Sequence, residues 1–136
     1  MTSVAQERLR VLFCDHLAIA RGKYITLQPG QGGGARFCRG TFGVTYEKEL
    51  IPVPGAMVME GLPDMEAVYS AEDIRPGWQP FTKVAVGDLR ANDGSPLPMC
   101  GRSALKRAVA DWKALGYEPM VGIELEAFAF QIEPNG

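Results

Sequence analysis

Residues 122–130 place two carboxylates one residue apart within a run that has the composition of a β-strand. Because strand side chains alternate between two faces, Glu124 and Glu126 project from the same side, roughly 7 Å apart. Phe128 and Phe130 continue that face, and the other face is lined by Ile123, Leu125, Ala127 and Ala129. Since both faces are largely apolar, the pattern predicts a strand covered on two sides, with its carboxylates in a cleft.

Two buried carboxylates repel each other and stay ionised only when a cation lies between them. Hard divalent metals bound by carboxylate oxygens are a common solution, and a nucleotide phosphate is a common further ligand. The pair Glu124 and Glu126 is therefore a candidate metal site. The alternative on spacing alone is a strand edge with two solvated glutamates.

The length of 136 residues allows one good core, or one small domain plus the beginning of another. Acidic and basic residues are interspersed and give a formal charge of −2, which argues against nucleic acid as the main partner. The apolar runs are too short for a membrane span, and the N-terminus lacks a signal-peptide type of hydrophobic stretch. We therefore expect no membrane partner.

Cys14, Cys38 and Cys100 are widely spaced and form no Cys-x-x-Cys pair. This odd number predicts reduced thiols in a cytoplasmic protein. A zinc site is not expected, because His16 is the single histidine and the sulfur ligands are scattered. We interpret His16 as a residue of a strand end or a turn.

Ten prolines and sixteen glycines predict a turn-rich chain of short strands. Residues 8–15 and 23–27 read as a β-hairpin, and further strands are expected at 57–60, 66–69 and 81–88. Residues 36–46 fit either a short helix or a strand. The glycine-rich stretch 30–34 reads as a surface loop, because it lacks the ending of a phosphate-binding loop.

The clearest helix is predicted over residues 102–115, followed by Gly116 as a helix stop. Its apolar stripe contains Leu105, Ala108, Val109, Trp112 and Leu115, and we expect Trp112 in the core. Lys106 and Arg107 are interpreted as a solvated face, and Arg102 as a structural residue at a domain junction. With a final strand over 117–132, the fold class is α+β.

Several stretches, in this order along the chain, resemble the glutamine synthetase family. They are Val11-Leu-Phe-Cys-Asp15 with Arg21-Gly-Lys23, Gly87-Asp-Leu-Arg-Ala-Asn-Asp-Gly-Ser-Pro96, Arg102-Ser-Ala-Leu-Lys-Arg107, Leu115-Gly-Tyr117 and Gly122-Ile-Glu-Leu-Glu126. The resemblance implies a β-grasp domain over residues 1–96. It implies that residues 97–136 are the first helix and strand of an α/β catalytic domain.

Enzymes of this family phosphorylate a carboxylate with ATP and let an amine displace the phosphate. The resemblance implies two divalent metals, Mg²⁺ or Mn²⁺, with Glu126 on the metal beside glutamate and Glu124 on the nucleotide metal. It also implies a homo-oligomeric ring in which this domain lines a neighbour's active site. Because the remaining ligands have no counterpart here, we expect this chain alone to bind no cofactor and to be inactive.

The chain departs from the family at its ammonium site, where an Asp-Gly-Ser-Ser segment is replaced by Phe37-Cys-Arg-Gly-Thr41. Arg39 near that position would repel ammonium, so relatives that join glutamate to larger amines, or that catalyse other ligations, fit at least as well. Two alternatives without chemistry are a self-standing β-grasp binding or assembly module and a truncated regulatory paralogue. In an autonomous module the last strand should pair within the domain and bury Phe128 and Phe130, whereas a ligase fragment should leave it unpaired.

Overall fold

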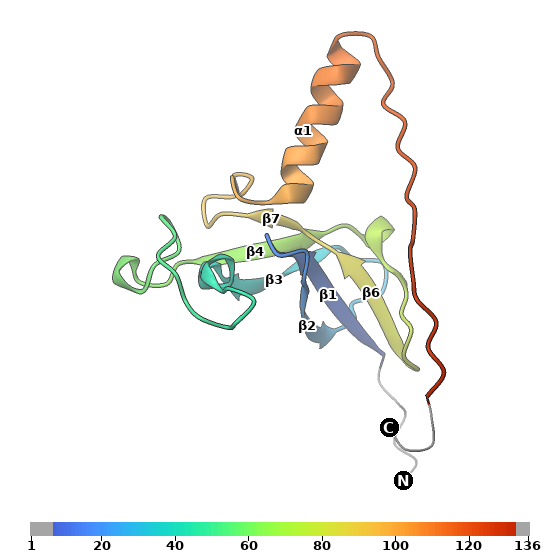
Figure 1. Cartoon of the computed structure of the whole chain (residues 1–136), viewed down its shortest axis with the longest axis horizontal. Helices are drawn as coiled ribbons and strands as arrows, with labels where there is room; N and C mark the ends of the chain where they lie inside the picture. Colours follow the sequence, from blue (N-terminus) through green and yellow to red (C-terminus); the bar gives the residue numbers. More distant parts are fainter. Residues whose placement is uncertain (1–6, 133–136) are drawn as a thin grey trace.

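A computed structural model describes residues 7–132 of the chain. Short strands and 3-10 turns are followed by one long helix (Figure 1). The strands are β1 (Arg8–Cys14), β2 (Ala20–Thr26), β3 (Gly33–Cys38), β4 (Asp64–Tyr69), β5 (Arg75–Pro76), β6 (Thr82–Val86) and β7 (Asp88–Arg90). The 3-10 helices are Arg39–Gly43, Val58–Glu60 and Ala71–Asp73, and the α-helix is α1 (Gly101–Ala114).

The first sheet contains four strands in the order β2-β1-β6-β5. β1 forms an antiparallel hairpin with β2 and lies parallel to β6, with Leu9 opposite Ile25 and Lys83. A hairpin whose first strand is joined by a later parallel strand is the β-grasp arrangement. The observed α+β architecture confirms the predicted fold class.

The second sheet contains three antiparallel strands in the order β3-β4-β7. Alternation along each strand sends one set of side chains inward, as the burial pattern of β4 shows at Met65, Ala67 and Tyr69. These side chains join Leu9 and Val11 of β1 in one buried cluster. The two sheets therefore share a single hydrophobic core.

The predicted strand at 81–88 is two strands that belong to different sheets. β6 ends at Val86, the backbone N–H of Gly87 donates to the Leu12 carbonyl at 2.8 Å, and β7 continues in the other sheet. This crossing at Gly87 was not visible in the alternation, because the period of two continues through it.

Other predictions were confirmed or corrected locally. The strands near 8–15 and 66–69 are present as β1 and β4, and residues 36–46 contain both alternatives, a strand that ends at Cys38 and a 3-10 helix. The strand expected at 57–60 is wrong, because this segment forms a 3-10 turn, and Gly33 and Gly34 belong to β3 instead of a loop. His16 lies in the turn after β1, as predicted.

α1 confirms the helix predicted over 102–115, but it points away from the two sheets and contacts them through its N-terminal part, next to β7 (Figure 1). Ser103 is its buried residue. In the described part of the chain, no helix is long and apolar enough to cross a membrane. All three cysteines are free thiols, as the sequence predicted.

Candidate functional site

Glu124 and Glu126 lie on a segment that leaves the end of α1 and runs outside the sheets (Figure 1). The strand predicted over 117–132 is wrong for this structure: within residues 7–132 this segment pairs with no other strand, and its side chains are exposed. A strand is stable only when a neighbour accepts its backbone hydrogen bonds. Phe128 and Phe130 still lie near each other, with ring centroids 6.4 Å apart, as residues two apart in an extended segment do.

Within residues 7–132, the apolar stripe of α1 is not covered either. Leu105, Trp112 and Leu115 are 61%, 53% and 72% exposed. The prediction that Trp112 is a core residue is wrong here, because the helix face that carries it meets neither sheet. Its indole packs instead edge-to-face against Tyr117, with ring centroids 5.6 Å apart. The helix and the segment after it thus present apolar side chains that soluble domains normally bury.

The base of α1 is held to β7 by a cluster of charges around Asp88. Arg102 Nε donates to Asp88 Oδ1 at 2.7 Å, and Lys106 Nζ contacts Asp88 Oδ2. Burial alone would raise the pKa of Asp88, but the hydrogen bonds from Lys106 and Arg102 outweigh it and lower the pKa. Arg102 therefore connects α1 to β7, while its predicted place at a domain junction stays a prediction. Lys106 is exposed, as predicted for a solvated face, and in addition pairs with Asp88.

The segment Phe37–Thr41, which replaces the ammonium-site motif, contributes no carboxylate. Arg39 Nε donates to the Asp64 carbonyl at 3.0 Å, so this side chain is directed toward the start of β4. Lys23 from β2 lies over the Phe37 ring, with Nζ 5.1 Å from the centroid. One cationic side chain within the segment, Arg39, and one from β2, Lys23, therefore lie at this position, which is unfavourable for a bare ammonium ion.

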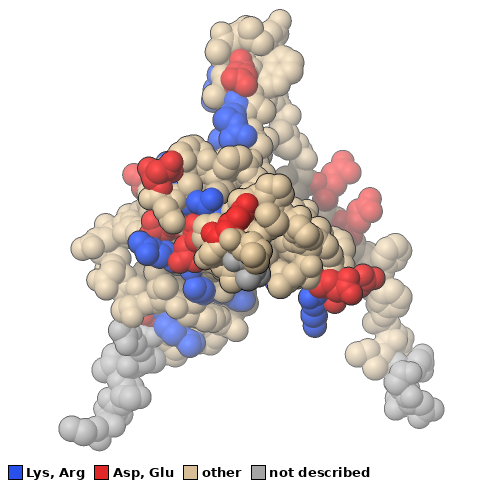
Figure 2. Space-filling model, turned by 90° about the vertical axis from the view of Figure 1, so that its left-hand side faces the viewer, with Lys and Arg blue, Asp and Glu red and all other residues tan. Residues whose placement is uncertain are grey.

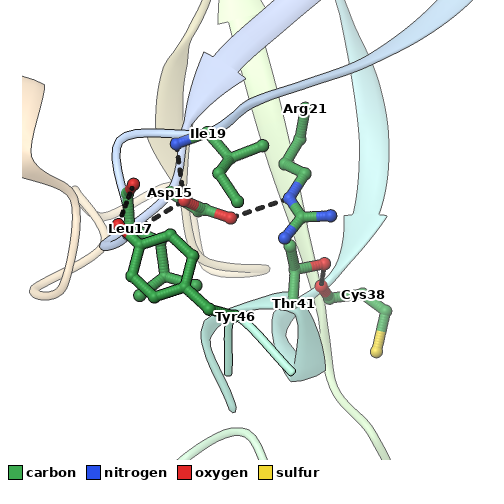
Figure 3. Close-up of polar contacts among 7 residues, drawn as sticks. All are labelled: Asp15, Leu17, Ile19, Arg21, Cys38, Thr41 and Tyr46. Atoms are coloured by element: carbon green, nitrogen blue, oxygen red, sulfur yellow. Dashed lines mark hydrogen bonds and ion pairs between the residues drawn. The ribbon is translucent and has the colours of Figure 1, made fainter. Parts of the chain in front are cut away.

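Asp15, the carboxylate at the end of β1, is fully engaged within its own hairpin (Figure 3). Its carboxylate accepts from the backbone N–H groups of Leu17 and Ile19 and from Arg21 Nε, at 2.9, 3.0 and 2.7 Å. In Figure 3 the Arg21 guanidinium extends toward the turn that carries Thr41. Asp15 stabilises the hairpin and has no free oxygen for an amine.

Sequence reasoning did not single out Asp15 or Asp88. For Asp15 a local signal existed, because an aspartate two residues before a turn N–H commonly forms an Asx-turn. Asp88 contacts residues 14 and 18 positions later, which no local pattern reveals. Glu124 and Glu126, which the sequence did single out, are not joined by a third ligand: no cluster of three or more metal-ligating side chains is found among residues 7–132.

Comparison with known proteins gives two sequence relatives and a solved structure, while no protein-family model matches the chain. The glutamine synthetase of Clostridium saccharobutylicum is 45% identical over 62 residues, and that of Methanosarcina mazei is 36% identical over 62 residues. Each match covers 43% of this chain and 14% of the relative. The chain thus spans a small part of the relatives that it matches.

A crystal structure described as a novel glutamine synthase homolog superimposes with a TM-score of 0.64 and 19% identity. The match covers 85% of this chain and 29% of that protein, and it shows a shared fold. The two sequence matches show that this chain is related, over 43% of its length, to the glutamine synthetase family.

Proposed function

We propose that the chain is the N-terminal part of a glutamine synthetase-like ligase that joins a carboxylate to an amine at the expense of ATP. In such a reaction the γ-phosphoryl group of ATP is transferred to the carboxylate, and the amine then displaces phosphate from the acyl phosphate. Residues 1–96 act as the β-grasp domain and residues 97–136 as the start of the catalytic domain. The sequence matches to glutamine synthetases support this assignment.

The observation that carries the proposal is the exposure of the C-terminal segment. Phe128 and Phe130 are 88% and 86% exposed, and Ile123 and Leu125 are 86% and 93% exposed. An autonomous binding module should bury these residues against its own sheets, whereas the start of a larger domain leaves them free for that domain. The exposure therefore favours the ligase over the self-standing module.

The metal ligands of the proposal are Glu124 and Glu126. As placed in this chain they do not form a complete site, because both are exposed on an unpaired segment without a third ligand among the described residues. Mg²⁺ takes six oxygen ligands in a near-ideal octahedron, which protein carboxylates share with waters and substrate phosphates in a fixed geometry. We infer that the chain alone holds neither metal nor ATP, and that the two glutamates bind Mg²⁺ or Mn²⁺ only beside further catalytic-domain residues.

The acceptor that we propose is an amine larger than ammonia. Support comes from the cationic border of Phe37–Thr41 and from Asp15, whose carboxylate is fully paired. We further propose a ring of identical subunits in which this segment faces a neighbour's active site. In that arrangement Arg39 discriminates against small cations and in favour of acceptors that also carry negative charge.

The test measures ATP-dependent phosphate release by the polypeptide that carries this sequence in its native reading frame, with glutamate and a panel of amines. The proposal expects release that depends on both substrates and that falls at least about a hundredfold in Glu124→Ala and in Glu126→Ala. Glu118→Ala, an exposed glutamate on the same segment, is the matched control and should retain full activity. Absence of phosphate release with every amine would overturn the ligase assignment.

A second measurement tests whether Glu124 and Glu126 can bind a metal without further ligands. Calorimetric titration of the 136-residue chain with Mn²⁺ should show no tight binding. Micromolar binding that disappears in Glu124→Ala and Glu126→Ala would contradict our inference that these two carboxylates need ligands from elsewhere.

A further inference from the structure

Three charged side chains form a row across the outer face of the three-stranded sheet. In the register of the sheet, Glu66 of β4 lies opposite Arg36 of β3 on one side and Arg90 of β7 on the other. Directly opposite residues in an antiparallel pair have Cβ atoms about 5 Å apart. The strand register therefore places Glu66 between two arginines.

These three charges remain free to bind something else. Among residues 7–132, the ion pairs involve other side chains, and none includes Arg36, Glu66 or Arg90. Arg90 donates one hydrogen bond, to the Gly94 carbonyl at 2.9 Å. The Glu66 carboxylate is folded over Gly34, where an added Cβ atom would lie 2.5 Å from Glu66 Oε1. The absence of a side chain at residue 34 thus leaves the carboxylate lying over β3.

The row opens into a polar cavity of about 410 Å³. Its wall is completed by Leu62 and Asn92, from the turns that flank the strands, and by Asp64, the first residue of β4. Arg39 also donates to the Asp64 carbonyl, which fixes the edge of the cavity at the start of β4. The volume is sufficient for a small polar molecule such as an amino acid.

The charged groups of this cavity balance: two arginines face two carboxylates, Glu66 and Asp64. The face shown in Figure 2 likewise carries acidic and basic side chains next to each other instead of in separate areas. A simple anion would meet repulsion from Glu66, and a simple cation would meet repulsion from the arginines. A molecule with both an ammonium and a carboxylate group can pair with the acidic and the basic side chains of the cavity at the same time.

We propose that this cavity binds a small zwitterionic amino acid. The carboxylate of the ligand is held by Arg36 and Arg90, because guanidinium groups match carboxylates in a bidentate geometry. The ammonium group is held by Glu66, with Asp64 at the rim. The proposal depends on the register of the three-stranded sheet and does not depend on the ligase assignment.

Three matched probes test the proposal on the unmodified 136-residue chain by titration of its backbone amide resonances. L-alanine carries both charges, propionate lacks the ammonium group, and ethylammonium lacks the carboxylate. We expect L-alanine to shift the amides of Glu66, Arg90 and Asn92 with a millimolar dissociation constant, and each truncated probe to bind at least about tenfold more weakly. Equal binding of propionate and L-alanine, or no shift at these amides at tens of millimolar L-alanine, would overturn the proposal.

Variants then test which side chains bind the carboxylate of the ligand and which bind its ammonium group. Glu66→Gln should lower the affinity for L-alanine at least about tenfold without lowering the affinity for propionate. Arg90→Gln should lower the affinity for both probes. Gly34→Ala keeps every charge but displaces the Glu66 carboxylate, so it should weaken L-alanine as well. Glu47→Gln, at an exposed loop position, is the control for loss of one negative charge and should change nothing. Unchanged L-alanine binding in a folded Glu66→Gln chain contradicts the assignment of Glu66.

Discussion

Gly87 lies so close to Ala67 that a Cβ atom added at residue 87 would meet the Ala67 Cβ and carbonyl carbon at 2.9 Å. This contact occurs where the chain leaves β6 in one sheet and enters β7 in the other. Most of the atoms that an added Cβ would meet belong to the backbone of β4, the central strand of its sheet, so moving them would disrupt the sheet. The approach of the two sheets at this point thus requires glycine.

We predict that Gly87→Ala lowers the free energy of unfolding by about 1–3 kcal/mol, the usual cost of overpacking a core. Urea denaturation followed by circular dichroism measures this change. Gly101→Ala is the control, because nothing lies within 4 Å of an added Cβ at the start of α1. A Gly87→Ala chain as stable as the control would show that the sheets separate without cost.

The hydrogen bonds of Asp15 predict a pH dependence. Burial alone would raise the pKa of Asp15, but the hydrogen bonds from Arg21, Ile19 and Leu17 outweigh it and bring the pKa below its ordinary value of 3.8. Since the folded pKa is the lower one, the charged carboxylate stabilises the fold above about pH 4. This contribution is lost as the pH falls through the folded pKa.

Asp15→Asn should therefore lower the free energy of unfolding at neutral pH by about 2 kcal/mol. Denaturation curves at a series of pH values should show the difference between the two chains shrinking below about pH 4. Asp73, Asp88 and Asp93 also have lowered pKa values, so the variant should keep part of the acid sensitivity. A constant difference at all pH values would exclude a role for the Asp15 charge.

Much of the β-grasp domain was predictable, because its signals are local. The alternation of Leu9, Val11 and Phe13 follows directly from burial on one face of β1, and the spacing of the apolar residues fixes α1. The order of the strands was not predictable from such patterns. Sheet order and register, which create the row of Arg36, Glu66 and Arg90, depend on contacts between distant parts of the chain.

For the candidate metal site, the sequence predicted the local pattern but not its surroundings. The alternation around Glu124 and Glu126 correctly indicated an extended segment with aromatic residues on the same side. It could not supply the neighbouring strand that a ladder needs, and the segment is exposed without one. Composition predicts which side chains a segment would bury, but it does not supply the partner that would cover them.

The Asp88 cluster predicts how α1 is attached. Because Arg102 and Lys106 are 42% and 55% exposed, their ion pairs with Asp88 are screened by solvent. Asp88→Asn should therefore cost at most about 1 kcal/mol in global stability. Hydrogen exchange at the amides of α1 should nevertheless accelerate, because the helix loses its charged contacts with β7. Arg107→Gln removes an exposed charge outside this cluster and should leave the exchange rates unchanged.

The exposed stripe of α1 gives a prediction that separates this chain from a longer polypeptide. In the 136-residue chain, Trp112→Ala should change the free energy of unfolding by less than about 1 kcal/mol, because the side chain is 53% exposed. Leu89→Ala, at a fully buried position of β7, should cost about 2–5 kcal/mol in the same urea titration.

In a polypeptide that continues into a catalytic domain, the same Trp112→Ala substitution should cost about 3 kcal/mol or more, since the stripe is then covered. A large cost already in the 136-residue chain would mean that the stripe is covered without further sequence. Urea denaturation repeated at several protein concentrations would then identify the cover. Stability that rises with concentration identifies a second copy as the cover, and constant stability places the cover within the chain. Either result would contradict the expectation that the apolar stripe of α1 is covered only in a longer polypeptide.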